Sequence, residues 1–343
     1  MMFMRNSIWS TIIILFVATN CAAQDVNFSQ FYELPLLRNP ALAGTFKGDL
    51  RLTSAFRNQW SSVTVPYRTT ALGTELRILT NPNSDNYFSV GLQITNDVAG
   101  DSKLSRTQIL PMIAFHKSMS AEKDAYLTLG VMGGYSQQRF DPSALKFSDQ
   151  FVGGAYSPSN ATHETFETNN KSYYDVTVGL SYSSEFGNDV KYYLGAALFH
   201  ITEPMVAFNT SNDVRLNQKY VLNVGVSTPI GEYDRFIVYG DYFREGGSNQ
   251  AQGGILLKKT LDRQNEEMPV SMSVGAFYRW DDAVVPVVKL EYHSLGFGLT
   301  YDVNTSSLKT ASHSKGGLEL TCSYSTFLNI KNTSLQATRC PSF

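Results

Sequence analysis

Residues Tyr174–Tyr182 have the sequence YDVTVGLSY, in which apolar side chains alternate with small or polar ones and a tyrosine stands at each end. Side chains along a β-strand point to alternate faces, so one face of this strand is purely apolar and bounded by aromatic rings. This arrangement is typical of strands that cross a bilayer, because tyrosine rings suit the boundary between hydrocarbon and headgroups. The stretch therefore predicts a membrane-spanning strand.

The same two-residue period recurs along most of the 343-residue chain. It predicts about fourteen strands: Leu50–Asn58, Tyr67–Leu79, Tyr87–Thr95, Leu104–His116, Ala125–Gln137, Tyr173–Ser184, Lys191–Ile201, Lys219–Thr228, Arg235–Phe243, Gln250–Lys259, Val270–Asp281, Val284–His293, Phe297–Val303 and Gly317–Phe327. An even number of strands suits a closed bacterial barrel. We therefore predict an all-β fold, a transmembrane antiparallel β-barrel of the bacterial outer membrane.

Charged residues in these segments fall on the face opposite the apolar one. They are Glu75, Arg77, Asp175, Asp241, Lys289, Glu291, Asp302 and Glu319. A charge that faces lipid at mid-depth costs roughly 2–4 kcal/mol, so this placement favours a barrel over a soluble β-sandwich or propeller. The inward charges could line a pore, or they could form a network of ion pairs that fills the lumen.

Both ends of the chain carry segments outside the predicted barrel. Residues 1–23 are typical of a secretory signal, with Arg5, an apolar core and the small residues Cys21–Ala23 before the cleavage site. Lipidation of Cys21 is the alternative. A disulfide between Cys322 and Cys340 and a lipid-facing Cys322 both remain open. The predicted organisation is a signal peptide (1–23), an N-terminal periplasmic segment (24–49), the barrel (50–328) and a C-terminal periplasmic tail (329–343).

Loop lengths predict an orientation with both termini in the periplasm. The long connections 138–172 and 201–218 then lie outside the cell, and the short connections 186–190, 229–233 and 294–296 lie in the periplasm. The longest loop carries five aromatic residues: Phe140, Phe147, Phe151, Tyr156 and Phe166. So many aromatic side chains in a polar loop imply that it folds over the barrel mouth or contacts a partner protein.

No pattern in the sequence predicts catalysis. The five histidines are scattered without metal-ligand spacing, and there is no nucleophile elbow or phosphate-binding glycine loop. A net charge of −2 gives no reason to expect nucleic acid as a partner. We predict a protein that is not an enzyme and has no cofactor and no metal site, and the sequence identifies no small-molecule substrate. An outer-membrane lipid hydrolase is disfavoured because no nucleophile–base pair is recognisable.

The segment Phe28–Gly44 precedes the first strand and has little strand periodicity. Pro35 and Pro40 prevent a long helix. The many apolar side chains of the segment need burial, either in the periplasmic mouth of the barrel or against another protein.

Short motifs at both ends of the chain match one known family. They are F-S-Q-[FY] at Phe28–Phe31, N-P-A-x-A-G at Asn39–Gly44, R-x-Q-W at Arg57–Trp60, Y-D-x-N at Tyr301–Asn304, and a glycine pair followed by an acidic residue at Gly316–Glu319. The tail Cys340–Phe343 is similar to that family's C-P-R-F, with Ser342 in place of the basic residue. On these motifs the chain resembles the PorP/SprF family of outer-membrane proteins of type IX secretion and gliding motility.

The resemblance implies a non-enzymatic outer-membrane barrel that works with the type IX secretion machinery. It implies either secretion itself or the export or surface attachment of a large adhesin. The candidate partner contacts are Phe28, Gln30, Phe31, Asn39, Pro40, Gly44, Arg57, Trp60, Cys340 and Phe343. The five loop aromatics are candidate contacts with the exported protein. A passive channel for small solutes is the alternative function.

Overall fold

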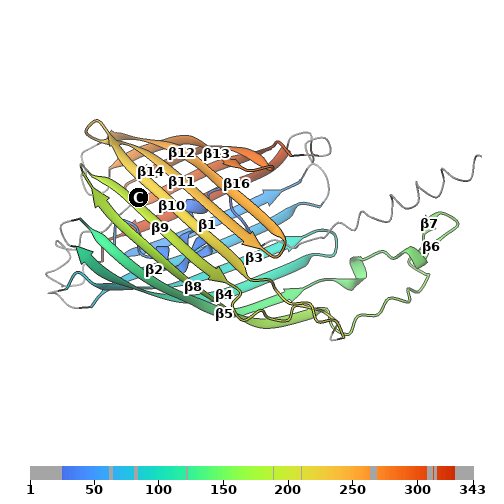
Figure 1. The fold of residues 1–343 in the computed structure, drawn as a ribbon. Coiled ribbons are helices and arrows are strands. Elements are labelled where there is room, and N and C mark those ends of the chain that lie inside the picture. The colour runs from blue at the N-terminus through green and yellow to red at the C-terminus, as the bar shows by residue number, and fades with distance from the viewer. Residues whose placement is uncertain are drawn as a thin grey trace, which may run out of the picture.

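The computed structural model describes residues 25–61, 65–80, 84–120, 123–187, 189–209, 211–262, 269–306, 312 and 315–328. Over these residues the chain forms a closed barrel of fourteen antiparallel strands (Figure 1). The barrel closes where β1 (Leu50–Gln59) pairs with β16 (Lys315–Thr326), with Leu50 opposite Thr326. The predicted fold and strand number are confirmed.

Each predicted segment corresponds to one barrel strand and differs from it only at the ends. The remaining strands are β2 (Tyr67–Leu79), β3 (Tyr87–Ala99), β4 (Leu104–Ser120), β5 (Ala125–Arg139), β8 (Asn170–Phe186), β9 (Val190–Phe199), β10 (Lys219–Ile230), β11 (Asp234–Glu245), β12 (Ser248–Asp262), β13 (Val270–Arg279), β14 (Ala283–Tyr292) and β15 (Leu295–Asn304). A separate hairpin, β6 (Phe151–Val152) and β7 (Ala155–Tyr156), lies between β5 and β8.

The two faces of β8 divide as the alternation predicts. Tyr174 is 73% exposed on the outer face, whereas Asp175 is 4% exposed on the inner face. The inward charges of the other strands are buried or half-buried and form ion pairs or hydrogen bonds within the lumen. Among the described residues, the inward charges therefore form a network of ion pairs, which was one of the two interpretations, and do not line an open pore. No helix among the described residues is long and apolar enough to span a membrane.

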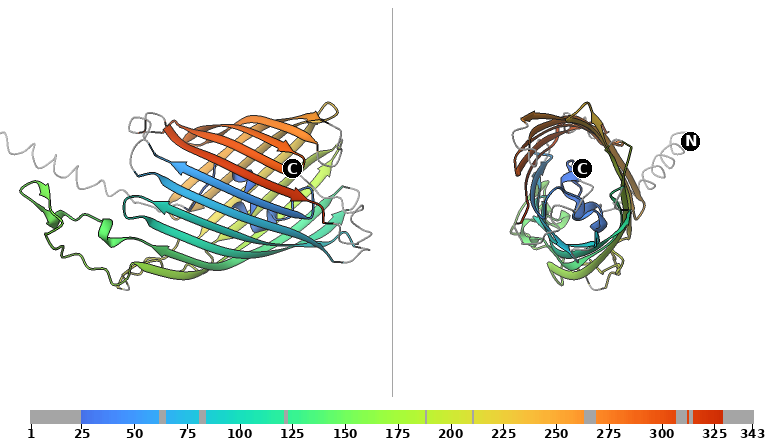
Figure 2. Two further views of the ribbon diagram at one scale, coloured as in Figure 1. Left: turned by 180° about the vertical axis from the view of Figure 1, so that it is seen from behind. Right: turned by 90° about the vertical axis from the view of Figure 1, so that its left-hand side faces the viewer.

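Residues 25–49 lie inside the barrel, where Figure 2 shows them as a blue segment within the ring of strands. The segment contains three short helices: η1 (Phe31–Glu33), α2 (Pro35–Arg38) and η2 (Pro40–Leu42). Pro35 and Pro40 begin α2 and η2, where a proline needs no intrahelical donor. We call residues 25–49 the lumen segment.

The lumen segment provides much of the core. Phe31 and Leu42 pack against a patch of the wall that includes Tyr239 and Phe277. Leu36 and Ala43 pack against a second patch, formed by Leu110, Met112, Ala114, Met132, Ala197, Phe199 and Val221. The apolar side chains that needed burial therefore find it inside the chain's own barrel.

The lumen segment runs from one end of the barrel to the other. Asp25 contacts Arg106 and His200, which lie at the end that carries the long connections 140–169 and 200–218. The backbone N–H of Asp49 donates to Thr326 at the opposite end, which carries the short turns 187–189, 231–233 and 293–294. We call these the long-loop end and the short-turn end.

The placement of the lumen segment bears on two expectations. The predicted periplasmic segment 24–49 lies, over its described residues, within the lumen, because its polar groups find partners on the inner faces of distant strands. Asp25 and Leu328, the first and last described residues, lie at opposite ends of the barrel. The two termini themselves lie outside the described residues, so their periplasmic location stays a prediction. Which end faces the periplasm stays a prediction.

The aromatic loop does not adopt one of the two arrangements that we considered for it, in which it folds over the barrel mouth. The β6–β7 hairpin projects away from the barrel and does not fold over its mouth (Figure 1). Nearer the barrel, Phe140 packs against Phe166 at 5.1 Å and against Phe208 of the β9–β10 connection at 4.7 Å, measured between ring centroids. The predicted signal peptide and the tail 329–343 lie outside the described residues. Cys322 is half-buried and forms no disulfide with another described residue, and a bridge to Cys340 stays untested.

Candidate functional site: the filled lumen

The first motif of the lumen segment binds the last strand. The backbone N–H groups of Ser29 and Gln30 donate to the two carboxylate oxygens of Glu319, at 2.7 and 2.6 Å. The hydroxyl of Thr321 donates to Gln30 Oε1 at 2.8 Å. A carboxylate that accepts two backbone N–H bonds forms strong, charge-assisted hydrogen bonds, so this contact fixes the segment to β16.

Asp302 on β15 is a second anchor. Its carboxylate accepts hydrogen bonds from the Ser29 hydroxyl at 2.6 Å, from Arg57 Nη2 at 2.7 Å and from Arg279 Nη2 at 2.5 Å. Asp302, Arg57 and Arg279 are buried. Buried charges are tolerated only when they are paired and hydrogen-bonded, so the three strands and the segment hold one another in place.

Arg38 of α2 forms the third anchor. Its guanidinium donates to both oxygens of Asp241 on β11, at 2.8 and 2.5 Å, and lies 4.8 Å from the centroid of the Phe31 ring. Asn223 donates to the same carboxylate at 2.8 Å. Burial by itself lowers the pKa of Arg38, but the Asp241 carboxylate raises that pKa above its ordinary value, so the guanidinium stays charged.

Glycines in the wall let the backbone of the segment approach closely. The side-chain amide of Asn39 donates to Leu180 O at 3.3 Å and to Ala196 O at 3.2 Å. A Cβ added at Gly179 would lie 1.9 Å from Asn39 Oδ1. Asn39 is fully buried and its Oδ1 accepts from the N–H of Ala41, so it cannot move aside cheaply. Only glycine fits this position of β8 without displacing the segment.

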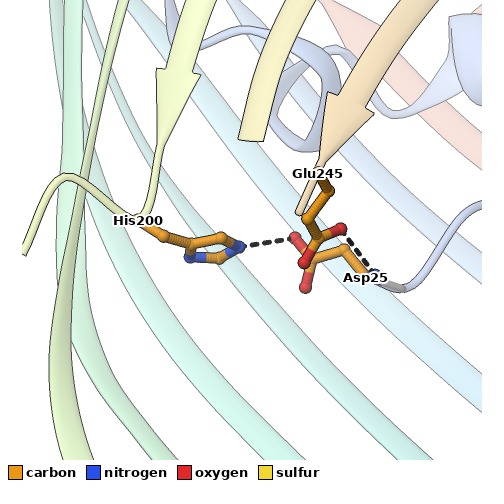
Figure 3. Close-up of side chains that lie close together, drawn as sticks. All are labelled: Asp25, His200 and Glu245. Carbon is orange, nitrogen blue, oxygen red and sulfur yellow. Dashed lines mark hydrogen bonds and ion pairs between the residues drawn. The ribbon is translucent and has the colours of Figure 1, made fainter. Parts of the chain in front are cut away.

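The start of the lumen segment is held by a network of charges at the long-loop end. Asp25 Oδ1 accepts from Arg106 Nη1 at 2.6 Å, and Asp25 Oδ2 lies 3.0 Å from His200 Nε2. The other ring nitrogen of His200 lies 2.6 Å from Asp175. The N–H of Asp25 donates to Glu245, and Figure 3 shows Asp25 between Glu245 and His200. Asp25, His200 and Glu245 bring possible metal ligands within 4.8 Å of one another.

This network fits ion pairing better than metal binding. Both oxygens of Asp25 already face cations, because Lys219 Nζ lies 3.5 Å from Oδ2 and Arg106 contacts Oδ1. A divalent ion would have to displace or lie beside these positive side chains. We therefore assign the network to the docking of the lumen segment.

The structure brings together most of the sequence-predicted partner contacts, but it places them inside the barrel. The residues Phe28, Gln30, Phe31, Asn39, Pro40, Gly44 and Arg57 are buried. Trp60 is half-buried and stacks edge-on against Tyr67. Cys340 and Phe343 lie outside the described residues. The observed contacts of the buried motif residues are with their own chain.

Sequence reasoning did not identify several members of the site. It found neither the role of Arg38 nor that of Arg279, and it did not single out Asp25 or His200. The sequence did contain a hint of the Glu319 and Asp302 anchors. One motif near the start of the chain offers hydrogen-bond donors around Ser29, and two motifs near its end offer the carboxylates of Asp302 and Glu319. Nothing local in the sequence pairs Arg38 with Asp241.

The family described as "Type IX secretion system membrane protein PorP/SprF" has a model that matches residues 20–324, which include the lumen segment and nearly all of the barrel. The chain belongs to the PorP/SprF family. The resemblance drawn from the motifs is confirmed, and this PorP/SprF barrel is a membrane protein of the type IX secretion system. A closed barrel with an apolar outer face is the architecture of outer-membrane proteins.

Several solved structures are similar to this chain over most of its length, each at low sequence identity and with a TM-score below 0.5. The Ralstonia pickettii toluene transporter TbuX has 10% sequence identity and a TM-score of 0.48, over 85% of this chain and 92% of that one. The CymD monoaromatic hydrocarbon channel has 11% identity and a TM-score of 0.45, over 86% and 93%. CdiB from Acinetobacter baumannii has 7% identity and a TM-score of 0.41, over 80% and 60%. No curated protein sequence matches the chain significantly.

Proposed function

We propose that this PorP/SprF barrel supports the secretion or surface attachment of partner proteins, such as gliding-type adhesins, through direct contacts with those proteins and with the type IX machinery. The observation that carries the proposal is the filled lumen. The lumen segment is anchored to the wall through Glu319, Asp302 and Asp241. A barrel that is filled in this way acts through its two ends and its loops.

The long-loop end offers a surface that suits an exported partner. Phe151 and Val152 at the β6–β7 hairpin are 49% and 66% exposed, and Phe151 packs on Tyr156 at 5.6 Å between ring centroids. Apolar side chains exposed on a projecting hairpin favour contact with another protein. We assign this hairpin to the exported protein and the short-turn end to the machinery, with both ends of the barrel placed as the loop lengths predict.

The filled lumen also bears on the two rival functions. A passive solute channel needs a continuous aqueous path, and the lumen segment occupies the middle of the barrel. An enzyme needs a nucleophile beside a base. The charged groups described in the lumen are engaged with one another or with the lumen segment.

The test is surface display of a cognate exported protein. Phe151→Ser combined with Val152→Ser should reduce antibody labelling of that protein on intact cells several-fold. The matched control is Glu164→Ser with Thr165→Ser, which changes two exposed residues of the same loop. Heat-modifiable migration in gels checks that each barrel is folded. Unchanged display with the folded hairpin variant would contradict the assignment of the hairpin.

A further inference from the structure

A cavity of about 290 Å³ remains between the lumen segment and the wall at the short-turn end. The lumen segment forms one side of it, with Tyr32 and Phe46 among the lining residues. Strands β1, β9, β11, β12, β13, β14, β15 and β16 form the other side. We call this cavity the vestibule.

The vestibule is lined mainly by positive charge. Seven lysine and arginine side chains line it, against two carboxylates, Glu33 and Glu291. Two of the seven, Arg38 and Arg51, are paired with Asp241 and Glu75, which lie behind the lining. Both carboxylates already bind Lys289, at 2.5 and 3.1 Å, and Glu291 also pairs with Lys258. The lining therefore offers no carboxylate that is free of a cation.

Two of the cations have their charge only partly neutralised, although Arg235 also donates hydrogen bonds to the Ser227 hydroxyl and to the backbone oxygens of Asp189 and Ser227. Lys191 on β9 and Arg235 on β11 both form an ion pair with Asp189. Among the described residues, no other carboxylate pairs with either of them. The side chain of Asp189 is 50% exposed, so water weakens its hold on both cations. The Lys191 and Arg235 side chains are only 17% and 21% exposed. An excess of positive charge thus remains inside a partly enclosed space, where it attracts anions most strongly.

The other lining groups indicate the kind of anion. Hydroxyl groups of Ser273 and Ser323 can donate hydrogen bonds to acceptors, whereas that of Ser271 already donates to Glu291 at 2.8 Å. Between the cations lie apolar side chains, including Leu42, Ile237 and Leu256. The cations come from the lumen segment and from several strands, and they form separate pairs, Lys191 with Arg235 on Asp189 and Lys258 with Lys289 on Glu291. Spaced cations separated by apolar patches match carboxylates spaced along a peptide better than a single compact phosphate.

We propose that the vestibule binds an extended, acidic peptide segment of a partner protein. The proposal rests on the proposed function, in which the short-turn end faces the type IX machinery. Carboxylates of the peptide pair with the Lys191–Arg235 side of the vestibule, and its small apolar side chains contact Leu42 and Ile237. The site gives the barrel a means to select an acidic partner at the end opposite the aromatic hairpin.

The probe is a peptide of alternating aspartate and alanine that carries an uncharged fluorophore. Its binding to the purified full chain in uncharged detergent micelles is followed by fluorescence anisotropy. The twin peptide with asparagine in place of aspartate should not bind. Raising the salt concentration should weaken binding of the acidic peptide, because screening acts on the attraction between the charges.

The decisive variant is Lys191→Gln combined with Arg235→Gln. It should weaken binding about tenfold or more. The matched control, Lys103→Gln with Lys123→Gln, removes the same charge from exposed positions outside the vestibule and should bind as the unchanged chain does. If the double variant fails to fold, Lys258→Gln is the substitute, because Glu291 keeps Lys289 as a partner. It should weaken binding several-fold.

Three outcomes would overturn the proposal. They are equal binding of the asparagine twin, unchanged binding by the vestibule variants, and displacement of the peptide by inorganic phosphate at the peptide's own concentration. Because this assay needs neither cells nor secretion, it separates the two proposals. If the hairpin variant leaves surface display unchanged but the acidic peptide binds, only the function assigned to the hairpin is contradicted. If the hairpin variant reduces surface display but the acidic peptide does not bind, only the vestibule proposal is contradicted.

Discussion

The carboxylate of Glu319 accepts the backbone N–H of Ser29 at 2.7 Å, although 290 positions separate the two residues. The last strand of the barrel therefore holds the segment that precedes the first. Gln30 adds a second bond to the same carboxylate at 2.6 Å. This contact can form only when β16 is in place, so it couples the position of the lumen segment to the strand that closes the barrel.

Glu319→Gln should loosen this anchor. The glutamine amide keeps one acceptor oxygen but turns an NH₂ group toward one of the two backbone donors, which leaves a buried N–H without a partner. The expected loss in the free energy of unfolding is about 1–3 kcal/mol. Urea titration of the purified barrel measures it. Glu164→Gln in the exposed loop is the control and should change little; equal stability of both variants would contradict the anchor.

Gly179→Ala tests the close approach of Asn39 to the wall. The added methyl group would lie 1.9 Å from Asn39 Oδ1, so the lumen segment must shift. Overpacking of this kind costs about 1–3 kcal/mol. The same urea titration applies. Gly247→Ala is the matched control, because a Cβ there meets nothing within 4 Å. The interpretation fails if the two alanine variants unfold at the same urea concentration.

The barrel itself was predictable because lipid constrains every second residue. In β8 the alternation from Tyr174 to Tyr182 follows from the cost of exposing polar groups to hydrocarbon, and the same cost places Asp175 inside. The pattern is local, so a single sequence reveals it. Strand ends were less certain because the alternation continues past the bilayer, as in β4, which extends to Ser120.

The lumen segment was not predictable in the same way. Its partners are distant: 203 positions separate Arg38 from Asp241 and 273 separate Ser29 from Asp302. Contacts of that kind leave no period in the sequence, and short helices started by prolines resemble a loop. The apolar residues of Phe28–Gly44 showed that the segment needed burial, but they could not distinguish the chain's own lumen from a partner's surface.

Deletion of Phe28–Gly44 should turn the closed barrel into a conducting one. The unchanged protein should show little conductance in a planar bilayer, because the segment occupies the lumen. Removal exposes the inward charges of Asp241, Asp302 and Glu319 to water, which favours a hydrated path. Deletion of 147–166 is the control, since it removes a loop of similar length outside the lumen. High conductance of the unchanged protein, or none after the first deletion, would contradict the filled lumen.

The docking of Asp25 should weaken at alkaline pH. Burial by itself lowers the pKa of His200, but the Asp25 carboxylate outweighs it and raises the pKa of His200 to about 9. A raised pKa means that the folded state binds the proton more tightly than the unfolded state, where a histidine pKa is about 6.5. The stabilisation is therefore complete below about pH 6.5 and is lost as the pH rises through about 9.

We expect the free energy of unfolding to fall by roughly 3 kcal/mol between about pH 6 and about pH 10, which is the pKa difference of His200 converted to energy. Urea titrations of the purified barrel over this range measure the fall. His200→Gln removes the titrating group and should flatten the curve. His163→Gln, in the exposed loop, should leave it unchanged. A fall of the same size in His200→Gln would show that some other group carries the pH dependence, because the ion pair between His200 and Asp25 is absent from that variant.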